Sequence, residues 1–98
     1  MRLEVFGKIN CAKCNSAKEK LAHLLSKDGA AGAASLHFFD LDSVEGMAEG
    51  AFSDVLQIPT VILRSDDGLV AARWEGKAPL TSEVQAALGA TKGLSAVQ

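Results

Sequence analysis

The sequence predicts a small α/β domain in which a mixed four-stranded sheet is flanked by three helices, in the order β-α-β-α-β-β-α. Stretches rich in β-branched and aromatic residues alternate with stretches of helical periodicity, and strands joined through helices must run parallel. An Asp67-Gly68 turn then indicates a hairpin that adds an antiparallel strand. The 98 residues, 48% of them hydrophobic and 22% charged, suffice for one globular core.

The first strand is predicted over residues 2–6, and the first helix begins just after Cys11. Residues 2–6 alternate and include β-branched and aromatic side chains, and Gly7 interrupts the pattern. Beyond Cys11 an apolar stripe recurs at helical spacing, formed by Cys14, Ala17, Leu21, Leu24 and Leu25. The glycines within residues 29–34 indicate where this helix ends.

The second strand is predicted over residues 36–41, which are apolar on both faces, as buried parallel strands are. Asp42 or Ser43 is placed to cap a second helix. Gly46 and Gly50 are expected to weaken that helix by up to about 1 kcal/mol each relative to alanine. Its apolar positions keep helical period and comprise Val44, Met47, Ala48, Ala51, Phe52 and Val55.

The last elements are a hairpin and a helix. Pro59 ends the helical pattern, residues 60–64 predict the third strand, and residues 69–74 predict its antiparallel partner. Thr81 is placed to cap the final helix, on which three apolar residues share a face, namely Val84, Ala87 and Leu88.

Composition narrows the class of protein. Ten basic and twelve acidic residues give a net charge of −2, which argues against a nucleic-acid partner. No apolar run reaches the roughly 18 residues that a membrane span needs, and residues 1–8 lack the features of a signal peptide. We therefore expect a cytoplasmic monomer without membrane contact, built as one domain over residues 1–90 with a disordered tail over 91–98.

The chain contains two cysteines, Cys11 and Cys14, and in the cytoplasm a structural disulfide between them is disfavoured. Cys11 falls where a strand gives way to a helix, and the unpaired N–H groups and dipole of a helix N-terminus favour a thiolate. Lys8 and Lys13 add positive charge, whereas Cys14 belongs to the apolar stripe. We therefore predict thiol–disulfide exchange with Cys11 as the nucleophile and Cys14 as the resolving residue.

Two alternatives stay open. The cysteines could belong to a metal or iron–sulfur module completed by a second chain or by free thiols. Zinc needs four ligands, and the chain has no further cysteine or histidine pair to supply them. Within one chain we expect no metal site, a solvated His23, and a His37 that is packed or hydrogen-bonded in the core. A redox-inert adaptor, which uses its fold for binding alone, is the second alternative.

Two motifs carry a resemblance to known proteins: Cys11-Ala12-Lys13-Cys14 after the first strand and Ile58-Pro59-Thr60 before the third. With them, the chain resembles small thioredoxin-fold proteins of the glutaredoxin and thioredoxin families over roughly residues 1–90. Lys8 is similar to a lysine common in glutaredoxins. The resemblance implies a thioredoxin-like fold and an electron carrier that reduces protein disulfides. It also implies a reversible Cys11–Cys14 disulfide, no bound cofactor, and an upstream reductase as a further partner.

The resemblance also implies a substrate-binding surface. Pro59 would be cis and packed opposite the cysteines, with Ile58 offering its backbone to the substrate and Thr60 beside it. Residues 74–79, WEGKAP, resemble the Trp-Ser-Gly-Phe-Arg-Pro stretch of the redoxins that reduce ribonucleotide reductase, where this loop lies beside the active site. By that resemblance Trp74, Gly76 and Lys77 line a docking surface, although a packing role for Trp74 is equally open.

The chain departs from both families at several positions. Thioredoxins usually have tryptophan before the first cysteine and a buried aspartate in the first strand, where this chain has Asn10 and Val5. Gln57 before Ile58-Pro59 follows the thioredoxin order, and only Gly76 stands in the turn where glutaredoxins carry Gly-Gly-x-Asp for glutathione. These departures leave the use of glutathione open, and the Ala12-Lys13 spacer between the cysteines leaves the reduction potential open.

Overall fold

The structure is a computed structural model that describes residues 1–27 and 34–97. Its sheet has the order β2-β1-β3-β4 and consists of β1 (Arg2–Gly7), β2 (Ser35–Asp40), β3 (Thr60–Arg64) and β4 (Val70–Glu75). β1 is parallel to β2 and antiparallel to β3, which is antiparallel to β4. The described residues also form three helices, α1 (Ala12–Lys27), α2 (Val44–Phe52) and α3 (Thr81–Val97). The predicted mixed sheet and element order are confirmed.

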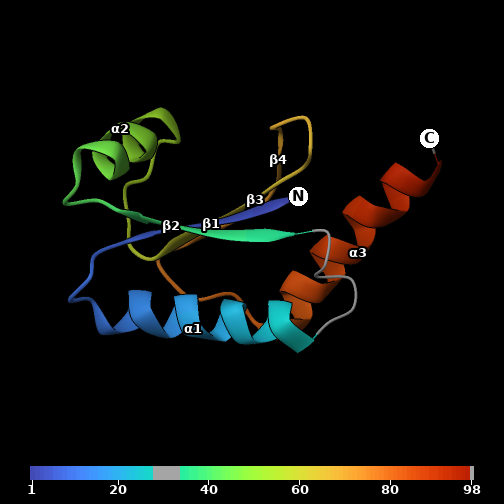
Figure 1. The fold of residues 1–98 in the computed structure, drawn as a ribbon, viewed down its shortest axis with the longest axis horizontal. Coiled ribbons are helices and arrows are strands. Elements are labelled where there is room, and N and C mark those ends of the chain that lie inside the picture. Colours follow the sequence, from blue (N-terminus) through green and yellow to red (C-terminus); the bar gives the residue numbers. More distant parts are fainter. Residues whose placement is uncertain (28–33, 98) are drawn as a thin grey trace.

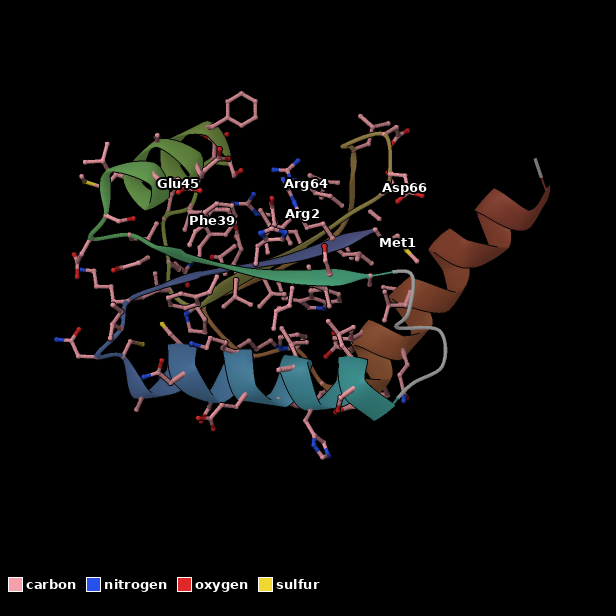
Figure 2. The ribbon with its side chains drawn as sticks, in the orientation of Figure 1. Met1, Arg2, Phe39, Glu45, Arg64 and Asp66 are labelled. Carbon is pink, nitrogen blue, oxygen red and sulfur yellow. The ribbon has the colours of Figure 1, made fainter. Side chains whose placement is uncertain are left out.

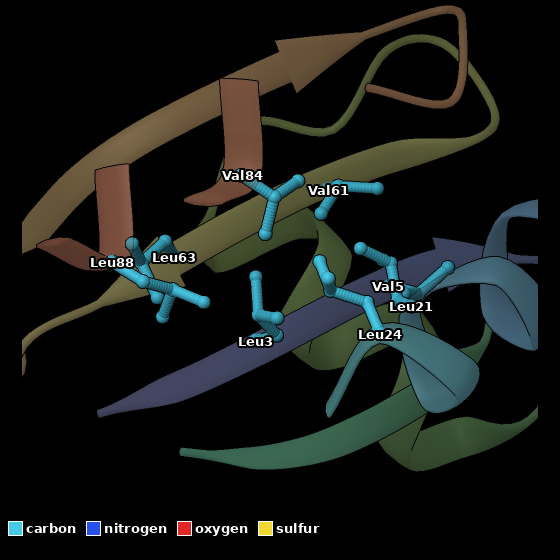
Figure 3. Packing of buried hydrophobic residues seen from close by; sticks show 8 residues of the cluster. All are labelled: Leu3, Val5, Leu21, Leu24, Val61, Leu63, Val84 and Leu88. Carbon is cyan, nitrogen blue, oxygen red and sulfur yellow. The ribbon is translucent and has the colours of Figure 1, made fainter. Parts of the chain in front are cut away.

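Helices cover both faces of the sheet (Figure 1), with α1 and α3 on one face and α2 on the other. Because side chains alternate along β1, Leu3 and Val5 point toward α1 while Phe6 points toward α2. The larger core lies on the α1 side (Figure 3) and comprises Leu3, Val5, Leu21, Leu24, Val61, Leu63, Val84 and Leu88. Burying each of these side chains stabilises the fold by about 1.5–3 kcal/mol.

The helix predicted after Ser43 is present, but its apolar residues do not form its buried face. Val44 and Phe52 are each 82% exposed and Met47 is 53% exposed, whereas the buried residues of the helix are Gly46 and Gly50. A Cβ atom at Gly46 would overlap the backbone of β2, and one at Gly50 would lie 2.8 Å from a methyl group of Leu41. The two glycines therefore let α2 approach the sheet with its backbone, and this leaves the apolar stripe outside.

The start of α2 is fixed by Ser43 rather than by Asp42. The Ser43 hydroxyl accepts a hydrogen bond of 2.9 Å from the N–H of Gly46, which satisfies a donor that a helix start leaves unpaired. The same hydroxyl donates to the carbonyl oxygen of Asp40 at 2.6 Å. The cap thus ties the first turn of α2 to the end of β2.

β2 lies at an edge of the sheet, and this overturns two predictions about it. Its burial is partial, with Phe39 as its buried side chain, so it is not covered on both faces. His37 is exposed, not packed in the core, and stacks on Phe39 with 6.4 Å between ring centroids. An edge strand lacks a neighbouring strand on one side, which leaves its side chains more open to solvent.

The predicted C-terminal ends of α1 and α3 can be compared with the structure only for α3. α3 remains helical to Val97, into the segment for which a disordered tail was expected over residues 91–98, and residue 98 is not among the described residues. The domain boundary at residue 90 stays a prediction. The glycines predicted to end α1 also lie outside the described residues. In the part of the chain that the structure describes, no helix combines the length and apolarity needed to cross a membrane.

Candidate redox site

The turn between β1 and α1 holds Cys11 immediately before the first residue of the helix. The N–H of Cys11 donates to the carbonyl oxygen of Lys8 at 3.2 Å, and its own carbonyl accepts from the N–H of Asn15 at 3.0 Å. The Asn15 side chain also donates to the carbonyl oxygen of Ile9 at 2.7 Å. These bonds hold the Cys11 thiol at the N-terminus of α1, where the helix dipole is positive.

The two cysteines meet there with unequal exposure. Cys11 is partly exposed, and Cys14 is fully buried, as its place in the apolar stripe predicts. Both are free thiols, and their Sγ atoms lie 2.6 Å apart. The backbone N–H of Cys14 also points at Cys11 Sγ, at 3.3 Å. A substrate can therefore reach Cys11 but not Cys14, while Cys14 is within bonding reach of Cys11.

This arrangement separates the pKa values of the two thiols. Hydrogen bonds from Cys14, first from its thiol and then from its backbone N–H, lower the pKa of the Cys11 thiol below its ordinary value. The charge of Lys13 lowers this pKa by a smaller amount. Burial raises the pKa of the Cys14 thiol, and the hydrogen bond that it donates to Cys11 raises it further. Cys11 is thus the thiol that ionises first.

The reactivity of the two thiols should differ with pH. Only a thiolate reacts with iodoacetamide, and because the pKa of Cys11 is lowered, its thiolate persists to lower pH than in the unfolded chain. We expect alkylation of Cys11 to reach half of its maximal rate below the midpoint of about 8.5 typical of a free thiol, and Cys14 to react only above it. Peptide mapping by mass across a pH series measures both. A Cys11 midpoint equal to that of the denatured protein would contradict the lowered pKa.

The two lysines predicted to tune Cys11 behave differently. Lys13 contributes the small lowering of pKa given above. The Lys8 ammonium instead lies 3.7 Å from a carboxylate oxygen of Asp42, and both side chains are exposed. Lys8 therefore acts on the turn mainly through its carbonyl oxygen, which holds the N–H of Cys11.

The register between β1 and β3 pairs the end of β1 with the start of β3. Phe6 pairs with Thr60, and the next residue of each strand along the sheet is Gly7 on β1 and Pro59 before β3. A Cβ atom on Gly7 would lie 2.6 Å from both Cβ and Sγ of Cys14, which means that Cys14 packs directly on this glycine. Sequence reasoning treated Gly7 only as a strand end, whereas the structure makes it the surface on which Cys14 packs.

The segment before β3 has the backbone conformation that the resemblance implies. The Ile58–Pro59 peptide bond is cis. Within residues 1–27 and 34–97, the backbone groups of Ile58 form no hydrogen bond, so they are available to a partner. Thr60 is fully buried, and its hydroxyl donates to the carbonyl oxygen of Gln57 at 2.6 Å, so its side chain supports the turn rather than facing a substrate.

The loop after β4 lies against the same segment. The N–H of Gly76 donates to the carbonyl oxygen of Pro59 at 2.9 Å. Gly76 has a φ of +77° and lies over the side chain of Gln57, so a Cβ atom would be both strained and obstructed. Together with the start of α1, this loop forms a groove of about 310 Å³ lined by Ala12, Lys13, Ser16, Gly76, Lys77 and Ala78.

Trp74 has a packing role in the structure. Its ring packs against the larger core, and its indole N–H donates to a carboxylate oxygen of Glu83 at 3.0 Å. This bond joins β4 to the first turn of α3. Of the three residues that the resemblance assigned to docking, Gly76 and Lys77 line the groove and Trp74 does not.

The histidines do not join the cysteines. His23 on α1 and His37 on β2 are both exposed. Among the described residues, no group of three or more histidine, cysteine or acidic side chains is arranged to hold a metal ion. A metal bound by Cys11 and Cys14 would therefore need ligands from another molecule or from the undescribed residues.

No protein-family model and no curated protein sequence matches the chain. Among solved structures, it is similar to thioredoxin 1 from the thermophilic eubacterium Thermosipho africanus, with a TM-score of 0.75 and 21% identity over 97% of this chain and 98% of that one. The chain has a thioredoxin-like fold. A structure described as a malarial protein is similar as well, with a TM-score of 0.71 and 19% identity over 92% of this chain and 94% of that one. The similarity of the structures establishes the fold of this chain. Sequence identities this low do not establish its function, which must be argued from its own residues.

Proposed function

We propose that this thioredoxin-like chain is a thiol–disulfide oxidoreductase that reduces protein disulfides through Cys11 and Cys14. The observation that carries the proposal is the asymmetry of the pair. Cys11 is reachable from solvent and has a lowered pKa, whereas Cys14 is buried, has a raised pKa and lies 2.6 Å away. An exchange reaction needs these two properties, a reactive entry thiol and a protected second thiol.

In the first step, the thiolate of Cys11 attacks one sulfur of a substrate disulfide. A bond forms between Cys11 Sγ and that sulfur, the substrate S–S bond breaks, and the second substrate sulfur leaves with the electron pair and takes up a proton. Ile58 supports this step, because its unpaired backbone groups lie next to Pro59 and can pair with the backbone of an extended substrate.

In the second step, Cys14 loses its proton and its thiolate attacks Cys11 Sγ. A Cys11–Cys14 disulfide forms, the mixed disulfide breaks, and the first substrate sulfur leaves as a thiolate that is protonated. Two protein thiols are thereby oxidised and one substrate disulfide is reduced to two thiols. Mixed-disulfide formation also removes the acceptor of the Cys14 hydrogen bond, which favours ionisation of Cys14 at the moment when it must attack.

The exchange transfers electrons between sulfur atoms, so the proposal requires no bound cofactor. It does require an upstream thiol or dithiol reductase that returns Cys11 and Cys14 to the reduced state after each cycle. A reducing compartment such as the cytoplasm, and a monomer whose Cys11 stays accessible, suit this role.

A redox titration tests the proposal. The purified protein is stripped of metal, equilibrated in graded thiol/disulfide buffers, alkylated, and analysed by mass. We expect a reversible two-thiol transition with a midpoint between about −200 and −300 mV, the range of cellular disulfide reductants. A midpoint near −120 mV would support an oxidant or isomerase instead. Two free thiols in every buffer would contradict exchange, and the metal module and the redox-inert adaptor would then be the remaining functions to test.

A further inference from the structure

The groove beside Cys11 carries a concentration of positive charge. Ala12, which lines the groove, follows Cys11 directly in the chain, so this part of the groove lies next to the turn that holds the proposed nucleophile. Lys13 lines it from α1 and Lys77 lines it from the loop after β4. Both lysines are exposed, and no ion pair of either is found in the described part of the chain.

A third lysine extends this charge along α1. Lys20 stands seven residues after Lys13, which places both on one side of the helix. Its ammonium donates to the carbonyl oxygen of Pro79 at 2.9 Å, in the loop that also carries Lys77. The positive charges therefore come from both walls, α1 and the loop.

The nearby carboxylates do not neutralise the groove. Glu75 forms an ion pair with Arg73, and the Glu83 carboxylate accepts the indole N–H of Trp74 and the backbone N–H of Leu80. Neither glutamate lines the groove. Glu19 is the one acidic residue of α1, and it does not line the groove. Among the described residues, no carboxylate therefore shares the groove with Lys13 and Lys77.

The charge of the groove opposes that of the whole chain. The net charge is −2, and acidic residues cluster around α2 and the β3–β4 hairpin, at Asp40, Asp42, Glu45, Glu49, Asp54, Asp66 and Asp67. An acidic partner is therefore repelled by much of the surface and attracted at the groove. Such a field orients the partner so that its acidic segment meets the groove next to Cys11.

We propose that this groove selects protein substrates in which acidic residues flank the reducible disulfide. The inference rests on the proposed function and specifies its substrate class. Exposed lysine–carboxylate contacts are weak individually, and each is expected to change the rate of reduction by up to about fivefold. Two or three contacts beside the nucleophile would then give a preference of about tenfold at low ionic strength.

The test compares two synthetic peptides with the same intramolecular disulfide, one flanked by three glutamates and the other by three glutamines. Reduced protein is used in excess, so that no upstream reductase is required. For each peptide, the second-order rate constant for reduction by the protein is divided by the rate constant for reduction of the same peptide by dithiothreitol. We expect the acidic peptide to be reduced about tenfold faster, and this ratio to fall toward one at 1 M salt, where the Debye length is about 3 Å.

Matched lysine variants locate the preference. Lys77→Glu should lower the ratio of acidic to neutral rates by about fivefold or more, because it replaces an attraction with a repulsion in the groove. Lys18→Glu makes the same change in net charge on the opposite flank of α1, where the Lys18 ammonium lies 5.0 Å from the centroid of the Phe38 ring. This control should leave the ratio unchanged.

These experiments distinguish failure of the acidic preference from failure of the proposed disulfide reduction, on which the preference rests. Reduction of neither peptide would overturn the proposed function itself. Equal reduction of both, or a ratio unchanged in Lys77→Glu, would overturn the acidic preference while disulfide reduction stands. A concentration-dependent dimer that Lys77→Glu abolishes would assign the groove to the acidic surface of a second copy, and would likewise overturn it.

Discussion

Cys11→Ser is expected to lower the rate of disulfide reduction by at least about 10³-fold, which corresponds to about 4 kcal/mol of transition-state stabilisation. The hydroxyl that replaces the thiol is not ionised near neutral pH and cannot form the mixed disulfide. Cys14 cannot take over, because it is fully buried. Single-turnover reduction of the neutral peptide, followed by alkylation and mass analysis, measures the loss.

Cys14→Ser should instead accumulate the mixed disulfide with Cys11, seen as an increase in protein mass equal to one substrate molecule. Serine is chosen because its hydroxyl retains a donor toward Cys11 Sγ, where Cys14 donates in the native protein. Cys14→Ala is the matched control, because it removes that donor and should raise the pH midpoint for alkylation of Cys11. A mixed disulfide trapped by Cys11→Ser and not by Cys14→Ser would reverse the roles.

The sequence was sufficient for the features that depend on local periodicity. The apolar stripe that begins at Cys14 correctly predicted the buried face of α1, and therefore the unequal exposure of the two cysteines. The alternation of strand-like and helical segments likewise predicted the element order. In both cases each residue that carries the signal lies only a few positions from the next one in the pattern.

At α2 the periodicity correctly predicts a helix but does not identify its buried face. Val44, Met47 and Phe52 have helical spacing, but Gly46 and Gly50 allow the helix to pack more closely through its backbone. A glycine in a helix is a penalty when only propensity is considered. The close approach that compensates for it depends on the position of β2, which the pattern of α2 does not contain.

Other features depended on residues that are far apart in the sequence. The position of β2 at the edge of the sheet, and with it the exposure of His37, follows from strand order. The Lys8 ammonium lies 3.7 Å from a carboxylate oxygen of Asp42, which is 34 positions away in the sequence, although residues 8–14 contain no acidic residue. Such pairs become visible only once the topology is known.

Glu4→Ala is expected to lower the free energy of unfolding by about 3–5 kcal/mol, the cost of removing one partner from a buried ion pair. Glu4 is 1% exposed, and one carboxylate oxygen accepts a hydrogen bond of 2.7 Å from Nε of Arg64. The other oxygen lies 2.5 Å from a guanidinium nitrogen of Arg2 without hydrogen-bond geometry. Figure 2 shows both arginines on the α2 side of the sheet. Denaturant unfolding measures the change.

The control for this variant is Arg2→Ala, which removes the more exposed partner. The Arg2 side chain is 44% exposed, whereas that of Arg64 is 15% exposed and also bonds to Ser53 and Gly68. We expect Arg2→Ala to cost no more than about 1 kcal/mol, as exposed ion pairs do. A Glu4→Ala protein within that same range would show that the buried carboxylate contributes little to stability.

The position of Glu4 lets it contribute to the stability of the fold without taking part in the chemistry of the cysteines. The resemblance to thioredoxins led to Val5 as the position where a buried acid would be expected, and this chain instead buries an acid one residue earlier. Because side chains alternate along β1, Glu4 faces α2, while Val5 faces α1 and the side on which Cys14 packs. The carboxylate is therefore separated from Cys14 by the sheet and is not placed to accept its proton. Glu4→Ala should consequently destabilise the fold while leaving the pH midpoint for alkylation of Cys11 unchanged. A shifted midpoint would mean that charge on the α2 side of the sheet influences the pKa of Cys11.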